Sequence, residues 1–245
     1  MSKATVMICG EAGTGKTQCF FKNKQLDING LNPAETFIIS LQKNELPMRG
    51  WRKHFTPFGK DNPKGNFLIS DNISVITNII KYINASRPDI KYLIIDDFTY
   101  LIANEYMRRN KEKSYDKFLD IGHMAFTLLN QCIKETRDDM YVFITAHSEP
   151  QVDPITGMPV ASIKTIGKML SEKYNIAGLF NYLLFSSSEM LDTDEGQRIN
   201  KYFITNSDGT TMAKTPQGVF NTIKIPNDAA YIIKCIEDYE NGDDE

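Results

Sequence analysis

The sequence has few of the patterns that mark disulfide-bonded, metal-bound or membrane-spanning chains. Its four cysteines (Cys9, Cys19, Cys132 and Cys235) are scattered, with no Cys-x-x-Cys pair. That usage is typical of a reduced intracellular protein without a structural metal. No apolar run approaches the roughly 20 residues that cross a bilayer, and the amino terminus turns polar too early for a signal peptide. We therefore expect a cytoplasmic protein that does not bind membranes.

The chain also lacks a large excess of charge of one sign. A net charge of −3 argues against a protein that binds nucleic acid through general basicity. The charge is uneven, however. Between Lys43 and Lys64 there are six Lys or Arg against two acids, and from Glu237 to Glu245 there are six acids and no base. Local charge therefore matters more than the total.

Short strand-like runs alternate along the chain with stretches of helical spacing. The strand candidates are residues 5–9, 36–41, 67–70, 92–96, 140–146 and 179–186. Two of these runs contain "LIIDD" and "YVFITA", which are apolar without alternation, as in parallel strands covered on both faces. Apolar stripes within residues 73–83 and 118–132 predict helices. This order predicts an α/β fold with a central, mainly parallel β-sheet flanked by helices.

The chain shows no internal repeat and no low-complexity linker. We therefore expect a single domain over residues 1–236. Within it, residues 149–168 are expected to be rich in loops and residues 201–225 rich in β-structure. The acidic residues 237–245 are expected to form a disordered tail.

The strongest motif is "GEAGTGKT", Gly10 to Thr17, which fits the P-loop pattern G-x-x-x-x-G-K-[ST] fully. An apolar strand precedes it and a helix-compatible stretch follows. The glycines let backbone N–H groups point at phosphate oxygens, and a helix N-terminus would add to this anion site. Lys16 would reach the β- and γ-phosphates, and the Thr17 hydroxyl would bind Mg²⁺. The residues predicted to bind ATP are Gly10, Glu11, Ala12, Gly13, Thr14, Gly15, Lys16, Thr17 and Gln18.

A second motif is "YLIIDDF", Tyr92 to Phe98, a buried strand that ends in two carboxylates. P-loop enzymes use an acid at this place on the Mg²⁺ side of the site, which predicts that role for Asp96. Asp97 follows where many P-loop ATPases place an acid that polarises the attacking water. Asp is also favoured just before a helix, and "TYLIANEYM" follows. A catalytic role and a helix-capping role are both open for Asp97.

The stretch "FITAHSEP", Phe143 to Pro150, places one of only three histidines at the end of an apolar run. Ligands of open α/β sheets bind at the carboxyl ends of the strands. If this strand lies beside the Asp96 strand, His147 can detect the terminal phosphate through a hydrogen bond. The alternative is a structural histidine at a strand end.

The stretch "LPMRGWRKHFTPFGKDNPKGNF" interleaves cations with aromatic rings. Cations for phosphates and flat rings for bases are what single-stranded nucleic acid requires. The segment between Lys43 and Lys64 is therefore a candidate contact for single-stranded DNA. The alternative is a long loop whose aromatic rings pack on the domain while its charges are solvated.

These motifs together carry a family resemblance. The order "GEAGTGKT", "LPMRGW", "YLIIDDF", "FITAHSEP", "TIGKML", "FITNSDGTTMAKTPQGVF" and "IPND" resembles phage-encoded P-loop ATPases with a RecA-like core, relatives of recombinases linked to single-strand annealing. The resemblance covers residues 6–228. It implies a RecA-type sheet, ATP and Mg²⁺ as cofactors, and single-stranded DNA as partner.

The resemblance also implies roles for individual residues. RecA-type ATPases take their catalytic glutamate from the region after the second strand, which makes Glu45 a rival to Asp97 as the base. His147 would sense the γ-phosphate. Lys214 would reach the site of a neighbouring subunit and so require a homo-oligomer; by itself it is a solvated turn lysine. The segment from Glu149 to Lys168, which includes Lys164, would contact DNA.

The sequence thus predicts a Mg²⁺-dependent ATPase, stimulated by single-stranded DNA, that acts in phage recombination, annealing or replication. A single-strand-binding protein is a possible further partner, and the cytoplasm of an infected bacterium is the expected location. A nucleotide kinase and an accessory module that uses ATP structurally are the alternatives. The chain has no visible arginine-bearing lid of the kinase type.

Overall fold

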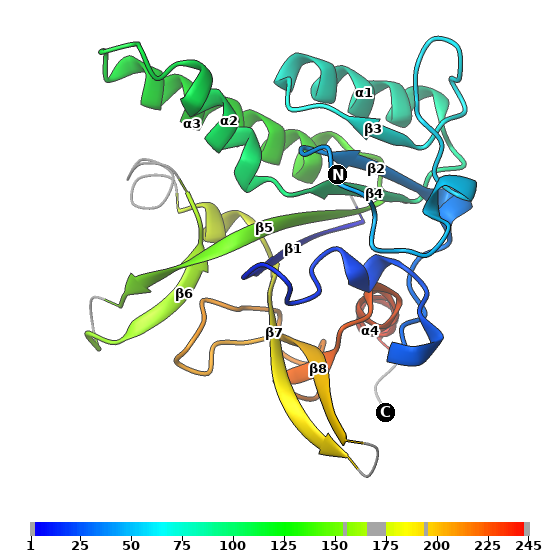
Figure 1. Cartoon of the computed structure of the whole chain (residues 1–245), viewed down its shortest axis with the longest axis vertical. Coiled ribbons are helices and arrows are strands. Elements are labelled where there is room, and N and C mark those ends of the chain that lie inside the picture. Colours follow the sequence, from blue (N-terminus) through cyan, green and yellow to red (C-terminus); the bar gives the residue numbers. More distant parts are fainter. Residues whose placement is uncertain (1–2, 154–155, 166–174, 194–195, 243–245) are drawn as a thin grey trace.

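The computed structural model describes residues 3–153, 156–165, 175–193 and 196–242. Its centre is a nine-stranded sheet with the order β3-β2-β4-β5-β1-β7-β8-β9, and β6 pairs with β5 off this path (Figure 1). The strands are β1 (Ala4–Gly10), β2 (Thr36–Ser40), β3 (Phe67–Ile69), β4 (Tyr92–Asp96), β5 (Tyr141–Val152), β6 (Pro159–Ile163), β7 (Tyr182–Thr193), β8 (Gly196–Ile204) and β9 (Lys224–Pro226).

The strands β3, β2, β4, β5, β1 and β7 pair in that order, and each of these pairings is parallel. Strand β6 pairs antiparallel with β5, β8 with β7, and β9 with β8. Strand β1 is buried along its whole length, as its unbroken apolar run requires. The expected α/β fold with a central, mainly parallel sheet flanked by helices is confirmed. Because β5 lies between β1 and β4, the carboxyl ends of β1 and β4 meet the middle of β5 at one edge of the parallel sheet.

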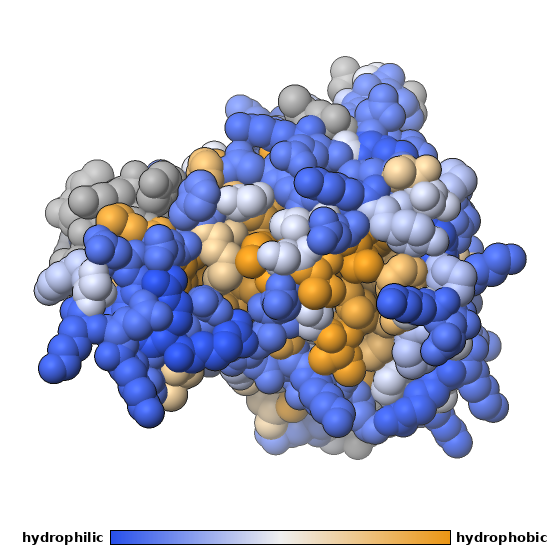
Figure 2. All heavy atoms as spheres, turned by 90° about the horizontal axis from the view of Figure 1, so that it is seen from above, coloured by the Kyte–Doolittle hydropathy of each residue, from blue (hydrophilic) through white to orange (hydrophobic). Residues whose placement is uncertain are grey.

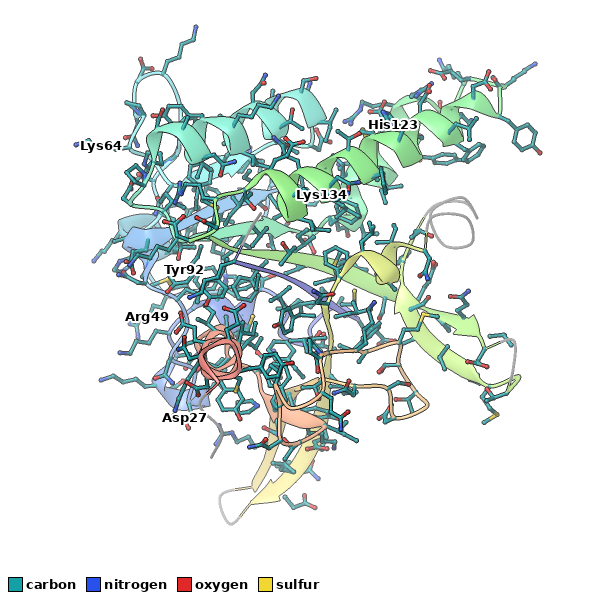
Figure 3. The ribbon with its side chains drawn as sticks, turned by 180° about the vertical axis from the view of Figure 1, so that it is seen from behind. Asp27, Arg49, Lys64, Tyr92, His123 and Lys134 are labelled. Carbon is teal, nitrogen blue, oxygen red and sulfur yellow. The ribbon has the colours of Figure 1, made fainter. Side chains whose placement is uncertain are left out.

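Helices cover both faces of this sheet. The helices α1 (Ile73–Ser86), α2 (Thr99–Arg108) and α3 (Asp116–Asn130) pack on one face, and α4 (Ala229–Asn241) packs on the other (Figures 1 and 3). Alternate residues of β1 divide between the two cores: Met7 faces the α1–α3 side and Ile8 the α4 side. Each apolar stripe of a helix therefore meets one face of the sheet.

The outer surface above α1, α2 and α3 is not uniformly polar. Apolar side chains gather near the middle of this face and hydrophilic side chains surround them (Figure 2).

None of the helices in the described part of the chain is long and apolar enough to cross a membrane.

The segment after the P-loop differs from the expected helix. Residues Gln18–Phe20 form a short 3₁₀ helix, and the backbone is already in an extended conformation at Phe21. The side chains of Cys19, Phe20 and Phe21 are all buried, with Phe20 against Phe143 at 5.3 Å between ring centroids. Three consecutive buried side chains do not suit a surface α-helix, whose neighbours point about 100° apart. The phosphate loop therefore lacks a long helix at its end.

The segment expected to be rich in loops is largely a β-hairpin. Strand β5 continues six residues beyond Ala146 to Val152 and pairs with β6, with Ser148 opposite Ile163. The second strand of this hairpin supplies the hydrogen-bond partners that a lone extension of β5 would lack. Lys164 follows β6, and Lys168 lies outside the described residues.

The acidic end of the chain is also more ordered than expected. Helix α4 continues to Asn241, so residues 237–241 are helical rather than a disordered tail. The Glu237 carboxylate accepts hydrogen bonds from Lys3 Nζ at 3.1 Å and from the Tyr141 hydroxyl at 3.0 Å. These contacts tie the last turns of α4 to the sheet. Residues 243–245 lie outside the described residues.

Candidate nucleotide-binding site

The loop from Gly10 to Thr17 leaves the carboxyl end of β1 and turns tightly. At Gly10 a Cβ atom would overlap the side chain of Ser186, whose hydroxyl donates to the Cys9 carbonyl at 3.1 Å. At Gly15 the backbone has φ of +99°, and a Cβ would lie 2.8 Å from Asn227 Oδ1. Both positions therefore require glycine, one for space and one for space and backbone conformation.

Lys16 is held over its own loop. Its Nζ donates to the carbonyl oxygens of Gly10 at 3.0 Å and Glu11 at 2.8 Å, and the residue is 6% exposed. Burial lowers the pKa of Lys16, while the nearby carboxylates of Asp97 and Asp96 oppose that shift. The ammonium group thus rests on two neutral acceptors, which phosphate oxygens can replace with stronger, charge-assisted bonds.

Asp96, the last residue of β4, connects this strand to the phosphate loop and to β5. Its Oδ1 accepts hydrogen bonds from the hydroxyls of Thr17 at 2.9 Å and Thr145 at 2.7 Å. Burial, and then the charge of Asp97, raise the pKa of Asp96 to about 6, against the effect of the two hydroxyl bonds. The carboxylate is therefore ionised at neutral pH but in a costly environment, which a cation would relieve.

The oxygen atoms at this point suit Mg²⁺. Magnesium prefers oxygen ligands, keeps several of its waters, and is usually bound by one or two protein groups together with substrate phosphates. The Thr17 hydroxyl and the Asp96 carboxylate are 2.9 Å apart at the foot of the phosphate loop. These are the two residues predicted to hold the metal, and their donor chemistry fits it.

Asp97 adopts an unusual backbone conformation. Its φ is +66°, a region that few non-glycine residues occupy, and its N–H donates to Thr145 Oγ1 at 2.8 Å. Helix α2 begins at Thr99 without a side-chain cap, so Asp97 is not the helix cap that its sequence context allowed. Its carboxylate oxygen lies 3.6 Å from His147 Nε2 instead. Backbone strain of this kind is concentrated at functional sites.

His147 lies within β5, opposite Gly10, where the parallel pairing with β1 ends and the pairing with β6 begins, so the prediction that it ends a strand is wrong. Its backbone N–H donates to the Thr99 hydroxyl at 2.9 Å, and its ring packs edge-on against Tyr100. Burial and the charge of Lys16 lower the pKa of His147, and Asp97 opposes them. The ring is therefore neutral at pH 7. Its backbone oxygen accepts from Lys164 N at 2.8 Å, which links the site to the β5–β6 hairpin.

Lys16, Thr17, Asp97 and His147 line one open cavity of about 360 Å³. Four further residues of the predicted ATP-binding set, Ala12, Gly13, Gly15 and Gln18, line the same cavity, whereas Asp96 does not. The cavity is lined by Ala12, Gly13, Gly15, Lys16, Thr17, Gln18, Asn44, Pro47, Asp97, Tyr100, His147 and Lys201. A cation, a strained carboxylate and a neutral imidazole therefore face the same space above the phosphate loop.

Two predicted catalytic residues lie apart from this cavity. The Glu45 carboxylate pairs with Arg52 at 2.6 Å on the surface, and 73% of its side chain is exposed. Lys214 forms an antiparallel backbone bridge with Leu183, the second residue of β7, and does not line the cavity. Neither residue meets the phosphate loop within one chain.

The aromatic rings of residues 43–64 pack mainly on the domain. Phe55 is buried against Phe21, and Phe58 packs on Phe37. This is the packing alternative that the sequence left open. The cations of the segment remain exposed, and Figure 3 shows Arg49 and Lys64 at the edge of the molecule.

Sequence reasoning missed Lys201 and Thr145. Lys201 reaches the cavity from β8, and its Nζ donates to Gln18 Oε1 at 2.9 Å. Nothing in its sequence neighbourhood marks it, because its place depends on the pairing of β7 with β8. Thr145 had a signal, since it is a polar residue within an apolar run two positions before His147.

Comparisons with known proteins give little beyond this geometry. No protein-family model matches the chain, and no curated protein matches it. Among solved structures, it is similar to a KaiC-like protein from the hyperthermophilic archaeon Pyrococcus horikoshii, with 14% sequence identity and a TM-score of 0.39. That match covers 83% of this chain and 78% of the archaeal chain. A similarity this low carries no functional argument.

Asp96→Asn should stabilise the nucleotide-free protein at pH 8 and leave its stability at pH 4 nearly unchanged. The folded-state pKa of about 6 lies above the ordinary 3.8, so the stability this carboxyl contributes is complete below pH 4 and lost as the pH rises through 6. The expected gain at pH 8 is on the order of 3 kcal/mol, at about 1.4 kcal/mol for each pKa unit between 3.8 and about 6. Denaturant unfolding at both pH values measures it.

Asp61→Asn, at an exposed carboxylate, is the matched control and should change stability little at either pH. If Asp96→Asn lowers the free energy of unfolding at pH 8, the description of Asp96 as a strained, uncompensated charge is wrong.

Proposed function

We propose that this chain is a Mg²⁺-dependent P-loop ATPase with a RecA-like core. The observation that carries the proposal is the convergence of Lys16 from the loop after β1, Asp96 from the end of β4 and His147 from within β5. These strands are β1, β4 and β5, and the position of β5 between the other two supports the RecA-like assignment. A phosphate loop with a lysine, a metal-side carboxylate and two further polar groups over one cavity suits phosphoryl transfer to water.

The residues divide the work of hydrolysis among them. Lys16 leaves the carbonyls of Gly10 and Glu11 and binds the β- and γ-phosphate oxygens, where its charge offsets that of the transferred group. Thr17 and Asp96 would hold Mg²⁺, which would supply further charge neutralisation. Asp97 orients the attacking water and accepts its proton. A carboxylate that projects into the cavity from a fixed, strained backbone is pre-positioned for that step.

In this proposal, His147 detects the terminal phosphate. The lowered pKa favours the neutral imidazole, which carries one N–H group, and this group can donate a hydrogen bond to a phosphate oxygen. Its backbone oxygen is bonded to Lys164 N, at the end of β6. A shift of His147 when phosphate binds would therefore move the β5–β6 hairpin.

We propose further that ATP turnover is coupled to single-stranded DNA in phage recombination, annealing or replication. The exposed cations between Lys43 and Lys64 and the β5–β6 hairpin are the candidate contacts. A homo-oligomer would allow Lys214, which does not reach its own cavity, to act at the site of a neighbour. A single-strand-binding protein is a candidate accessory partner.

Lys16→Ala should lower the rate of ATP hydrolysis by about 100-fold or more, because it removes a charge that faces the transferred phosphate. The wild-type rate should rise when single-stranded DNA is added, and the variant should show no such rise. Release of inorganic phosphate, measured with and without DNA, checks both. Transfer of phosphate to a nucleoside with no response to DNA would favour a nucleotide kinase and contradict the proposal.

His147→Ala should keep ATP binding but lose the link between nucleotide and DNA. In the wild type, Mg²⁺–ATP should change the affinity for a labelled single strand roughly 5- to 150-fold, the usual range of allosteric coupling. The variant should bind DNA with the same affinity in both states, as read by fluorescence anisotropy.

His123→Ala is the matched control, since His123 lies exposed on α3, away from the phosphate loop (Figure 3). It should respond to ATP as the wild type does. A His147 variant whose DNA affinity still responds fully to ATP rules out the sensor role.

A further inference from the structure

A second cavity, of about 570 Å³, adjoins the one above the phosphate loop. Residues of strands β7, β8 and β9 and the stretch Leu26, Asp27 and Ile28 form its walls. Lys201 lines both cavities, so the two spaces meet at its side chain. Tyr202 and Ile28 give the second cavity apolar surface, and Arg198 gives it charge. Nothing in the hydrolytic mechanism uses this space.

Asn227, which also lines the second cavity, carries an unpaired amide. The residue is 5% exposed, and neither its Nδ2 nor its Oδ1 has a hydrogen-bond partner among the residues that the structure describes. The amide lies directly over the phosphate loop, because a Cβ on Gly15 would be 2.8 Å from Oδ1 and 3.1 Å from Nδ2. Burial of an amide without partners is costly, and native proteins leave few such groups without a reason.

The position of Asn227 does not depend on its own amide. Its neighbour Asp228 caps α4 and accepts from Ala230 N at 3.0 Å. The same carboxylate accepts from Asn29 N at 2.9 Å and Gly30 N at 3.0 Å, in the segment after the phosphate loop. This clamp fixes the turn that presents Asn227, so its amide is pre-organised and free to bind something else.

We propose that Asn227 recognises an adenine base lying in the second cavity while the phosphates of the same nucleotide lie on the loop from Gly10 to Thr17. An Asn amide offers one donor and one acceptor side by side, the pattern that pairs with the N6 amino group and N7 of adenine. The inference rests on the proposed function, since it places the base of the nucleotide whose phosphates that function requires.

The side chain of Lys201 controls access to the amide. Its Cδ lies 2.9 Å from the same point above Gly15 that the Asn227 amide approaches, and its Nζ is bonded to Gln18. Exchange of the Gln18 bond for a bond to nucleotide phosphate would swing this long, flexible stem. The amide would then face the cavity, so that phosphate binding and base recognition occur together.

The test compares binding of ATP, GTP and inorganic tripolyphosphate, each with Mg²⁺, by calorimetry. Wild type should bind ATP more tightly than GTP. Asn227→Leu should weaken ATP binding about tenfold or more, as expected for loss of a bidentate base contact, and leave tripolyphosphate binding unchanged. Asn227→Asp should shift the ATP-to-GTP affinity ratio toward GTP, because a carboxylate cannot donate to adenine N7 but can accept from the N1–H and N2 amino group of a guanine turned to present that edge.

Two controls separate base recognition from a structural role. Asn221→Leu, at an exposed position outside both cavities, should bind all three ligands as the wild type does. The melting temperature of ligand-free Asn227→Leu should not fall, since the amide has no partner to lose. A lower melting temperature would mean that the amide supports the fold, and would overturn the proposal.

The remaining outcomes are equally decisive. Unchanged ATP affinity in Asn227→Leu, or an unchanged ATP-to-GTP ratio in Asn227→Asp, means that the base lies elsewhere. Equal losses for ATP and tripolyphosphate mean that Asn227 acts on the phosphate loop and not on the base. If wild type binds neither nucleotide nor tripolyphosphate, the proposed function itself has failed, a result distinct from the other two.

Discussion

The buried carboxylate of Asp96 is the contact on which the rest of the site depends. One of its oxygens accepts hydrogen bonds from Thr17 and from Thr145, at 2.9 and 2.7 Å. It thereby fixes the end of the phosphate loop relative to β4 and β5. Because β5 lies between β1 and β4, this single group ties the loop after β1, the end of β4 and the middle of β5 to one point. The same burial that makes the junction rigid also makes the charge costly, so the site has a physical reason to take up a cation.

The charges around this junction are arranged for a ligand of opposite character. Lys16 rests on two carbonyls of its own loop, and the nearest imidazole, His147, is neutral. A Mg²⁺–triphosphate supplies the missing partners at once: anionic oxygens for the ammonium and a divalent cation for the carboxylate. Beyond the phosphates, the amide of Asn227 also has no partner among the described residues, and the proposed adenine base would supply one. Each of these groups is fixed by neighbours that do not themselves need the ligand.

The elements that the sequence predicted well are those determined by a local pattern of apolar and polar residues. The strand Tyr92–Asp96 was predicted with the bounds that it has, because an unbroken apolar run ends on a carboxylate. The meeting of Lys16, Asp96 and His147 followed from a general rule about the edges of parallel sheets. Pairing with distant strands decided the rest. It extended β5 into a hairpin and brought Lys201 from β8, and consecutive buried rings replaced the expected helix at Gln18–Phe20. No local pattern carries that information.

A structure with Mg²⁺ and a non-hydrolysable ATP analogue tests the central claim most directly. The account predicts that Lys16 Nζ leaves the carbonyls of Gly10 and Glu11 and contacts the β- and γ-phosphates, with the metal between Thr17 and Asp96. The Asp97 carboxylate and the His147 ring should face the terminal phosphate. A nucleotide bound elsewhere, with Lys16 still on its own loop, would contradict the account.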